Sequence, residues 1–124
     1  MNALHGALGR HLLAEFRGCD PVALADLETV TGAMLRAAEA SGATIKTHSF
    51  HHFSPQGVSG AVIIAESHLA IHTWPEHGFA AVDCFTCGDR VDARKALAVL
   101  REALGAQGED VMELQRGPLA FPRR

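Results

Sequence analysis

The stretch that decides the fold runs from Val58 to Cys87 and reads VSGAVIIAESHLAIHTWPEHGFAAVDCFTC. It contains three apolar runs, at 58–65, 68–74 and 79–87, that are rich in β-branched and aromatic residues, as strands are. The polar pair Glu66-Ser67 separates the first two runs, and the turn sequence PEHG separates the second from the third. Because both connections are short, the three strands are predicted to form an antiparallel meander.

The sequence before this stretch predicts two strands and a helix between them. Residues 8–16 are short, apolar and followed by a turn, and residues 43–53 alternate loosely and include β-branched and aromatic residues. Asp20 before Pro21 is a typical helix start, and apolar residues recur at helical spacing up to the stop signal Gly42. We therefore expect the order strand, helix, strand before Val58.

The sequence after Cys87 predicts a second amphipathic helix over residues 92–104 and an edge strand over residues 111–116. The order β-α-β-β-β-β-α-β predicts one α+β domain over residues 1–124, a two-layer α/β sandwich with an antiparallel sheet and helices on one face. The other sheet face is expected to be apolar and to stack on the sheet of a second copy in a homodimer, because small domains bury little surface alone.

Composition excludes several classes of protein. The 124 residues carry 11 Lys and Arg against 14 Asp and Glu, for a formal net charge of −3. Only two lysines are present, Lys46 and Lys95, so no basic stripe for nucleic acid is expected. No apolar run approaches the ~18 residues of a transmembrane helix, and the N-terminal residues lack the apolar core of a secretory signal. We expect a cytoplasmic protein that binds neither membrane nor nucleic acid.

Histidines and cysteines raise the alternative of a non-catalytic zinc-binding module. His68, His72, Cys84 and Cys87 are ligand types that zinc prefers. In a strand, however, residues four apart lie ~13 Å from one another, and Cys84 and Cys87 would point to opposite faces. No metal is therefore expected, and the odd number of cysteines, 3, argues against a disulfide framework.

Two other groups of residues suggest chemistry. Ser67 is a candidate nucleophile with a histidine nearby, although no G-x-S-x-G elbow and no acid partner accompany it. Phe53, Trp74 and Glu76 lie at predicted strand ends beside turns. Together they could hold a flat cationic ligand, because aromatic faces stack on heterocycles and attract cations. Residue types and spacing leave both interpretations open.

The strings GVSGAVIIA and ESHLAIHTWPEHGFAAVDCFTCG, with LGRHLLAEF and HHFSPQGVSG upstream, resemble the small prokaryotic S-adenosylmethionine decarboxylase proenzymes. These are pyruvoyl-dependent enzymes of spermidine synthesis, and the resemblance covers most of the chain. It implies self-cleavage between Glu66 and Ser67 into a β chain of residues 1–66 and an α chain of residues 67–124. The α chain would begin with a pyruvoyl group made from Ser67, so pyridoxal phosphate is not expected.

The resemblance also implies which residues take part in the chemistry. Ser67 is the precursor of the group that forms a Schiff base with the substrate. His72 matches the base of the cleavage reaction, and Ser59 assists that reaction by hydrogen bonding. Cys87, and not Cys84, matches the general acid that returns a proton to the substrate α-carbon.

For the substrate, the resemblance implies that Phe53 and Trp74 hold the adenine and lie near the sulfonium, while Glu76 binds the ribose hydroxyls. The family's sites are built across a dimer interface, which agrees with the expected open sheet face. Fold and cofactor do not fix specificity, so pyruvoyl chemistry on an amino acid such as arginine or ornithine stays as the alternative function.

Overall fold

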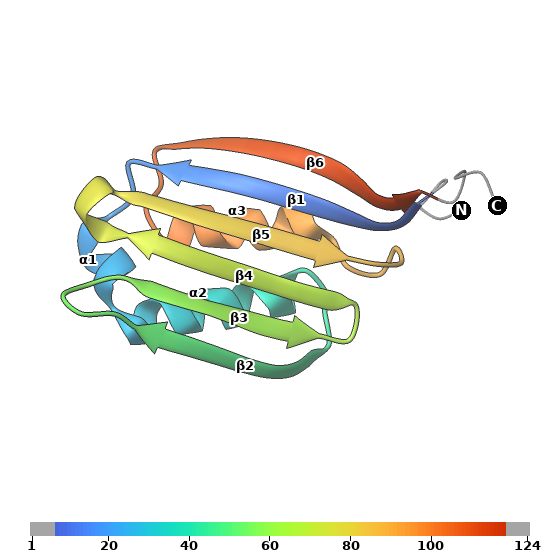
Figure 1. Cartoon of the computed structure of the whole chain (residues 1–124), viewed down its shortest axis with the longest axis horizontal. Helices are drawn as coiled ribbons and strands as arrows, with labels where there is room; N and C mark the ends of the chain where they lie inside the picture. The colour runs from blue at the N-terminus through green and yellow to red at the C-terminus, as the bar shows by residue number, and fades with distance from the viewer. Residues whose placement is uncertain (1–6, 119–124) are drawn as a thin grey trace.

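In the computed structural model, which describes residues 7–118, six strands form an antiparallel sheet in the order β2-β3-β4-β5-β1-β6 (Figure 1). The strands are β1 (Ala7–Arg17), β2 (Ile45–His52), β3 (Val58–Ile64), β4 (Ser67–Trp74), β5 (Phe79–Thr86) and β6 (Gly108–Pro118). The helices are α1 (Pro21–Ala25), α2 (Leu27–Ala40), the 3-10 turn η1 (Pro75–His77) and α3 (Ala93–Ala103). The predicted order of elements and the antiparallel meander are confirmed.

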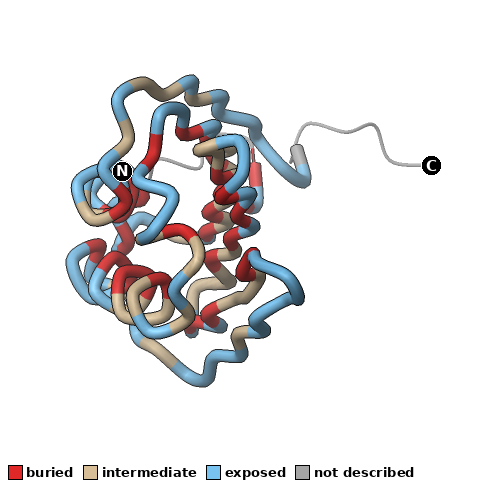
Figure 2. Tube along the Cα trace, turned by 90° about the vertical axis from the view of Figure 1, so that its left-hand side faces the viewer, coloured by how far each residue is buried: buried red, intermediate tan, exposed pale blue. Residues whose placement is uncertain are grey.

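The long helices α2 and α3 contact each other and cover one face of the sheet (Figure 1). Side chains alternate along the strands, so that Leu12, Phe16 and Leu69 point into the layer between sheet and helices and are buried there. Leu100 of α3 fills the same layer from the helix side. Buried positions accordingly gather where the helices and the sheet face each other (Figure 2). The predicted two-layer α+β sandwich is confirmed.

The structure differs from the sequence prediction in the helix after β1, which is not continuous. Asp26 has an extended backbone, with φ −98° and ψ 116°, and ends α1. Its carboxylate then caps α2, because it accepts hydrogen bonds from the Thr29 N–H at 2.9 Å and the Thr29 hydroxyl at 2.6 Å. These hydrogen bonds hold the pKa of Asp26 below its usual range. The sequence predicted one continuous helix because the helical spacing of apolar residues continues from Leu24 to Leu27, across this break.

The sheet face away from the helices, here called the open face, is less apolar than the sequence predicted. Large apolar side chains are exposed on it at Ile63, Trp74, Met112 and Leu114. Between them lies a polar group at the centre of the sheet that includes Asp83. In the part of the chain that the structure describes, no helix is both long and apolar enough to cross a membrane.

Candidate active site

The hairpin between β3 and β4 carries the predicted cleavage bond and is strained. Ile64 pairs with Ser67, so only Ala65 and Glu66 make the turn. Two-residue hairpins normally use glycine, asparagine or aspartate, and neither turn residue is one of these. Ser67 has φ 138°, and it is the one described residue other than glycine with a positive φ. Such a conformation costs about 1–3 kcal/mol, and it lies at the residue that follows the Glu66 carbonyl.

The Glu66 carbonyl oxygen accepts two hydrogen bonds from Cys87. The Cys87 N–H donates at 2.9 Å, and the Cys87 thiol donates at 3.2 Å. Two donors on one carbonyl oxygen are suited to stabilising the negative charge that develops there when a nucleophile attacks the carbonyl carbon. Glu66, Ser67 and Cys87 are called the cleavage group below.

The Glu66 side chain is also held in place. Its carboxylate is mostly buried, accepts a hydrogen bond from the Thr44 N–H at 3.3 Å and lies 3.7 Å from the Arg90 guanidinium. Because Arg90 is mostly exposed, this ion pair contributes little stability. The hydrogen bond from Thr44 and the burial of the side chain restrict the position of Glu66 beside the predicted cleavage bond.

A cavity of about 310 Å³ lies at the other end of β4, between this strand and the loop that follows β2. Five residues that the sequence analysis singled out line it, and they are called the pocket group below: Phe53, Ser59, His72, Trp74 and Glu76. Gln56, Gly57 and Thr73 complete the lining, and the sequence analysis did not find these three. The volume is at the lower end of the range of small-molecule sites.

Hydrogen bonds stabilise this cavity. The Ser59 hydroxyl lies 2.9 Å from His72 Nδ1, across the β3–β4 ladder. The Thr73 hydroxyl donates to the Leu24 carbonyl at 2.8 Å and accepts from the Val58 N–H at 2.9 Å. Phe53 and Trp74 are half-exposed, so their ring faces are available to a ligand. Glu76 in η1 provides a carboxylate at the rim.

The cleavage group and the pocket group lie at opposite ends of β4 (Figure 1). A strand rises ~3.3 Å per residue, so Ser67 lies about 16 Å from His72 and about 23 Å from Trp74 along β4. The structure therefore brings together Glu66, Ser67 and Cys87, and separately the five pocket residues, but it does not bring the two groups together within one chain.

The three cysteines differ in accessibility. Cys84 is buried, and this burial, reinforced by the negative charge of Asp83, raises the pKa of its thiol to about 12. Burial also raises the pKa of Cys19. Cys87 is exposed. Of the two thiols of the C-x-x-C sequence, Cys84 thus lies in the buried core and Cys87 is exposed directly after β5.

Comparison with known proteins decides the family. The sequence profile of the S-adenosylmethionine decarboxylase family matches residues 10–117. The S-adenosylmethionine decarboxylase proenzyme of Acidithiobacillus ferrooxidans is 58% identical over 111 residues, which cover 90% of this chain and 84% of that protein. The chain belongs to the S-adenosylmethionine decarboxylase family.

Other members of the S-adenosylmethionine decarboxylase family agree in sequence and in fold. The proenzyme of Thermotoga maritima is 54% identical over 90% of this chain and 85% of that protein. The crystal structure of the adenosylmethionine decarboxylase from Aquifex aeolicus superposes with a TM-score of 0.85 and 33% identity. It covers 95% of this chain and 98% of that one.

The cysteines provide a direct test of this site geometry. In native protein at pH 8, iodoacetamide should label Cys87 and leave Cys84 and Cys19 unlabelled, because a thiol with a raised pKa stays protonated and is not nucleophilic. Peptide mass mapping after brief labelling identifies the modified residue. Label on Cys84 at a rate equal to that on Cys87 would contradict the burial described here.

Proposed function

We propose that this chain is a self-cleaving, pyruvoyl-dependent decarboxylase that releases carbon dioxide from S-adenosylmethionine. The observation that carries the proposal is the cleavage group, in which the Glu66 carbonyl accepts two hydrogen bonds from Cys87 directly before the strained Ser67. The names of the relatives support the same activity. The product would be the aminopropyl donor for spermidine synthesis, and we infer that the enzyme acts in the cytoplasm.

The cleavage step follows from these contacts. The Ser67 hydroxyl attacks the Glu66 carbonyl carbon, and the negative charge on the carbonyl oxygen is stabilised by the Cys87 N–H and thiol. The peptide C–N bond breaks, which leaves an ester between Glu66 and Ser67. A base then removes the Ser67 α-proton, the Cβ–Oγ bond of Ser67 breaks, and residues 1–66 leave with a free Glu66 carboxylate. The dehydroalanine that remains at position 67 tautomerises to an imine, and its hydrolysis releases ammonia and leaves the keto group. Relief of the strain at Ser67 favours the reaction.

His72 is the proposed base, and it cannot reach Ser67 of its own chain, since about 16 Å of strand separates them. A homodimer resolves this problem. We place the two-fold axis between the stacked open faces and across the strands, so that each end of one sheet lies over the opposite end of the other. The cleavage group of one protomer then meets the pocket group of its partner. The exposed apolar side chains of the open face support such a stack.

The pyruvoyl group supplies an electron-withdrawing carbonyl that condenses with the substrate amine and accepts the electrons released with carbon dioxide. Ser67, its source, is the first residue of β4, at the end of the sheet. Cys87 carries an exposed thiol beside the Glu66 carbonyl, and we assign it the return of a proton to the substrate α-carbon.

The pocket group suits the nucleoside and sulfonium of the substrate. Phe53 and Trp74 offer ring faces for adenine and for the positive sulfur, and Glu76 can accept hydrogen bonds from the ribose hydroxyls. Arginine and ornithine would leave the aromatic faces without a stacking partner. Neither the amino-acid alternative nor the zinc-module alternative is supported by the relatives.

The activity is tested with substrates labelled at the carboxyl carbon. The purified protein should release labelled carbon dioxide from S-adenosylmethionine and not from arginine or ornithine. Glu76→Gln should lower kcat/KM about 10- to 150-fold, as expected for loss of a hydrogen bond to a charged group, and should still cleave itself. Glu39→Gln, at an exposed position of α2, is the matched control and should behave as the unsubstituted protein. Release from arginine or ornithine alone would disprove the substrate.

The shared site is tested by co-expressing two variants with different tags. Ser67→Ala cannot be cut but keeps an intact pocket group, whereas His72→Ala lacks the proposed base but keeps Ser67. Each variant alone should stay uncut. Random pairing of equal amounts places about half of the His72→Ala chains in mixed dimers, and in these every His72→Ala chain should be cut with help from its partner.

Gel electrophoresis of doubly purified mixed dimers gives the result. No cleavage in verified mixed dimers, or normal cleavage of His72→Ala alone, would show that the base is not supplied by His72 of the partner subunit. The decarboxylation assay does not depend on this outcome, so the activity and the shared site can fail separately.

A further inference from the structure

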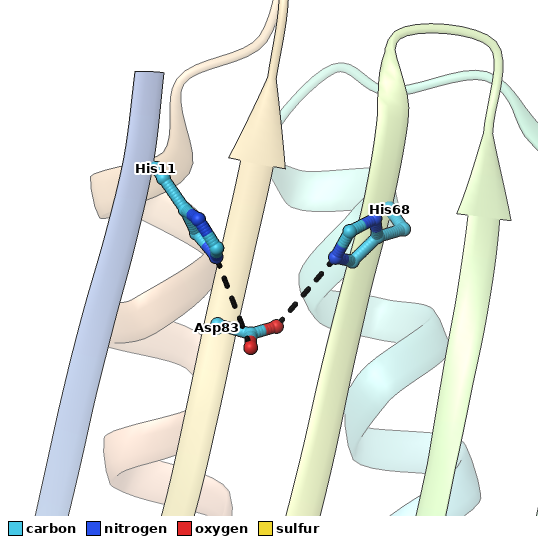
Figure 3. A group of neighbouring side chains, drawn as sticks. All are labelled: His11, His68 and Asp83. Atoms are coloured by element: carbon cyan, nitrogen blue, oxygen red, sulfur yellow. Dashed lines mark ion pairs between the residues drawn. The ribbon is translucent and has the colours of Figure 1, made fainter. Parts of the chain in front are cut away.

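Three side chains of types that bind metals converge on the open face, and none of them belongs to the cleavage group or the pocket group, although His68 directly follows Ser67. His11 extends from β1, His68 from β4 and Asp83 from β5 (Figure 3). Each offers one donor atom, and the three atoms lie within 4.8 Å of one another. The proposed reaction assigns no role to this cluster.

The donor atoms lie too far apart to satisfy one another. His11 Nε2 is 3.8 Å from Asp83 Oδ2, and His68 Nε2 is 3.7 Å from Asp83 Oδ1. Hydrogen bonds of this type are 2.7–3.2 Å long. His11 Nε2 and Asp83 Oδ1 are buried atoms without a hydrogen-bond partner among residues 7–118. A buried polar atom left unpaired is unfavourable, so the cluster lacks a central partner.

Packing fixes the orientation of both imidazoles. The Phe85 ring lies 5.2 Å from the His11 ring and 5.8 Å from the His68 ring, centroid to centroid. Phe85 is the partner of His11 in the β1–β5 ladder and of His68 in the β4–β5 ladder. The donors therefore come from three adjacent strands and are held by a shared aromatic neighbour, not by flexible loops.

We propose that His11, His68 and Asp83 form a binding site for a divalent transition-metal ion of the zinc type. Two imidazoles and a carboxylate are ligands that such ions accept, with a further position open to water. In tetrahedral geometry, bonds of 2.0–2.2 Å place donors about 3.3–3.6 Å apart. The His–Asp separations of 3.7 and 3.8 Å run to different carboxylate oxygens, and the three donor atoms lie within 4.8 Å of one another, so the side chains must close by up to about 1 Å to bind one ion.

Arg116 competes with the ion. Its guanidinium donates to His11 Nδ1 at 2.8 Å, which leaves the proton of the neutral ring on Nε2. Binding an ion at Nε2 requires the other tautomer, with the proton on Nδ1. Arg116, on the exposed edge strand β6, must release His11 when the ion binds. Replacing Arg116 should therefore raise the affinity of the protein for the ion.

The site would join the two products of self-cleavage. His11 lies in residues 1–66, whereas His68 and Asp83 lie in residues 67–124. An ion bound to all three stabilises the assembled form, because it binds the folded protein and not the separated chains. The binding site itself does not depend on the proposed activity.

The test uses Co²⁺ and Zn²⁺ with protein purified without a metal-affinity tag. Because the partner's sheet would cover the open face, the ion is supplied in the growth medium as well as by dialysis. The unsubstituted protein should hold one ion per chain, show visible absorption with Co²⁺ and melt at a higher temperature with Zn²⁺. His11→Gln and Asp83→Asn should each weaken binding at least 10- to 100-fold, the range seen when only an outer partner is lost.

Two further variants make the test specific. Arg116→Gln removes the competing cation and offers an oxygen to the His11 Nδ1 proton, so it should tighten binding about tenfold. His48→Gln, on the exposed edge strand β2, should bind as the unsubstituted protein does. Circular dichroism in chelator checks that every variant folds. A Co²⁺ spectrum and melting shift that persist in folded His11→Gln and Asp83→Asn would overturn the proposal, as would no binding to unsubstituted protein.

Discussion

The hydrogen bond from the Cys87 N–H to the Glu66 carbonyl ties the end of β5 to the hairpin between β3 and β4. This contact determines what the hairpin can do, because the same carbonyl precedes the one non-glycine residue with positive φ between residues 7 and 118. Strain at Ser67 and stabilisation of charge at Glu66 act on the same bond. The pairing of β5 with β4 sets the register in which the Cys87 N–H reaches the Glu66 carbonyl.

The length of β4 sets the second constraint. Ser67 begins the strand and Trp74 ends it, so the proposed cleavage site and the proposed substrate pocket are separated by the full extent of an eight-residue strand. A flat sheet covered by helices on one side cannot bring its own two ends together. In the proposed homodimer, a second sheet that lies on the open face in the opposite direction brings the two ends together. On this reasoning, the catalytic requirement and the need to cover apolar side chains are met by the same interface.

Local signals were sufficient to predict most elements from the sequence. The apolar runs of β3, β4 and β5, the helix start at Asp20 and the helical spacing over residues 92–104 marked strands and helices to within a few residues. The break at Asp26 was missed because apolar spacing continues across it, although a carboxylate three residues before Thr29 is itself a capping signal. The last strand is longer than predicted, Gly108–Pro118, because pairing with β1 continues beyond its apolar residues.

Some site residues could likewise be predicted from the sequence, and others could not. The Glu66–Ser67 bond and the five residues of the pocket group were singled out through motifs, whereas the donor role of the Cys87 N–H is a backbone property that no residue type reveals. His11, His68 and Asp83 meet only because β1 pairs with β5, an arrangement that local patterns do not specify. The expectation of no metal rested on the C-x-x-C sequence and its neighbouring histidines, and it did not consider this combination.

The central claim is that the strained bond between Glu66 and Ser67 breaks by itself, and the mass of freshly purified protein under denaturing conditions tests it most directly. We predict two chains, residues 1–66 and 67–124. The second should be lighter than a fragment of the same length that begins with serine, and it should lack a free N-terminal amine. A single full-length chain after long incubation would contradict self-cleavage at this site.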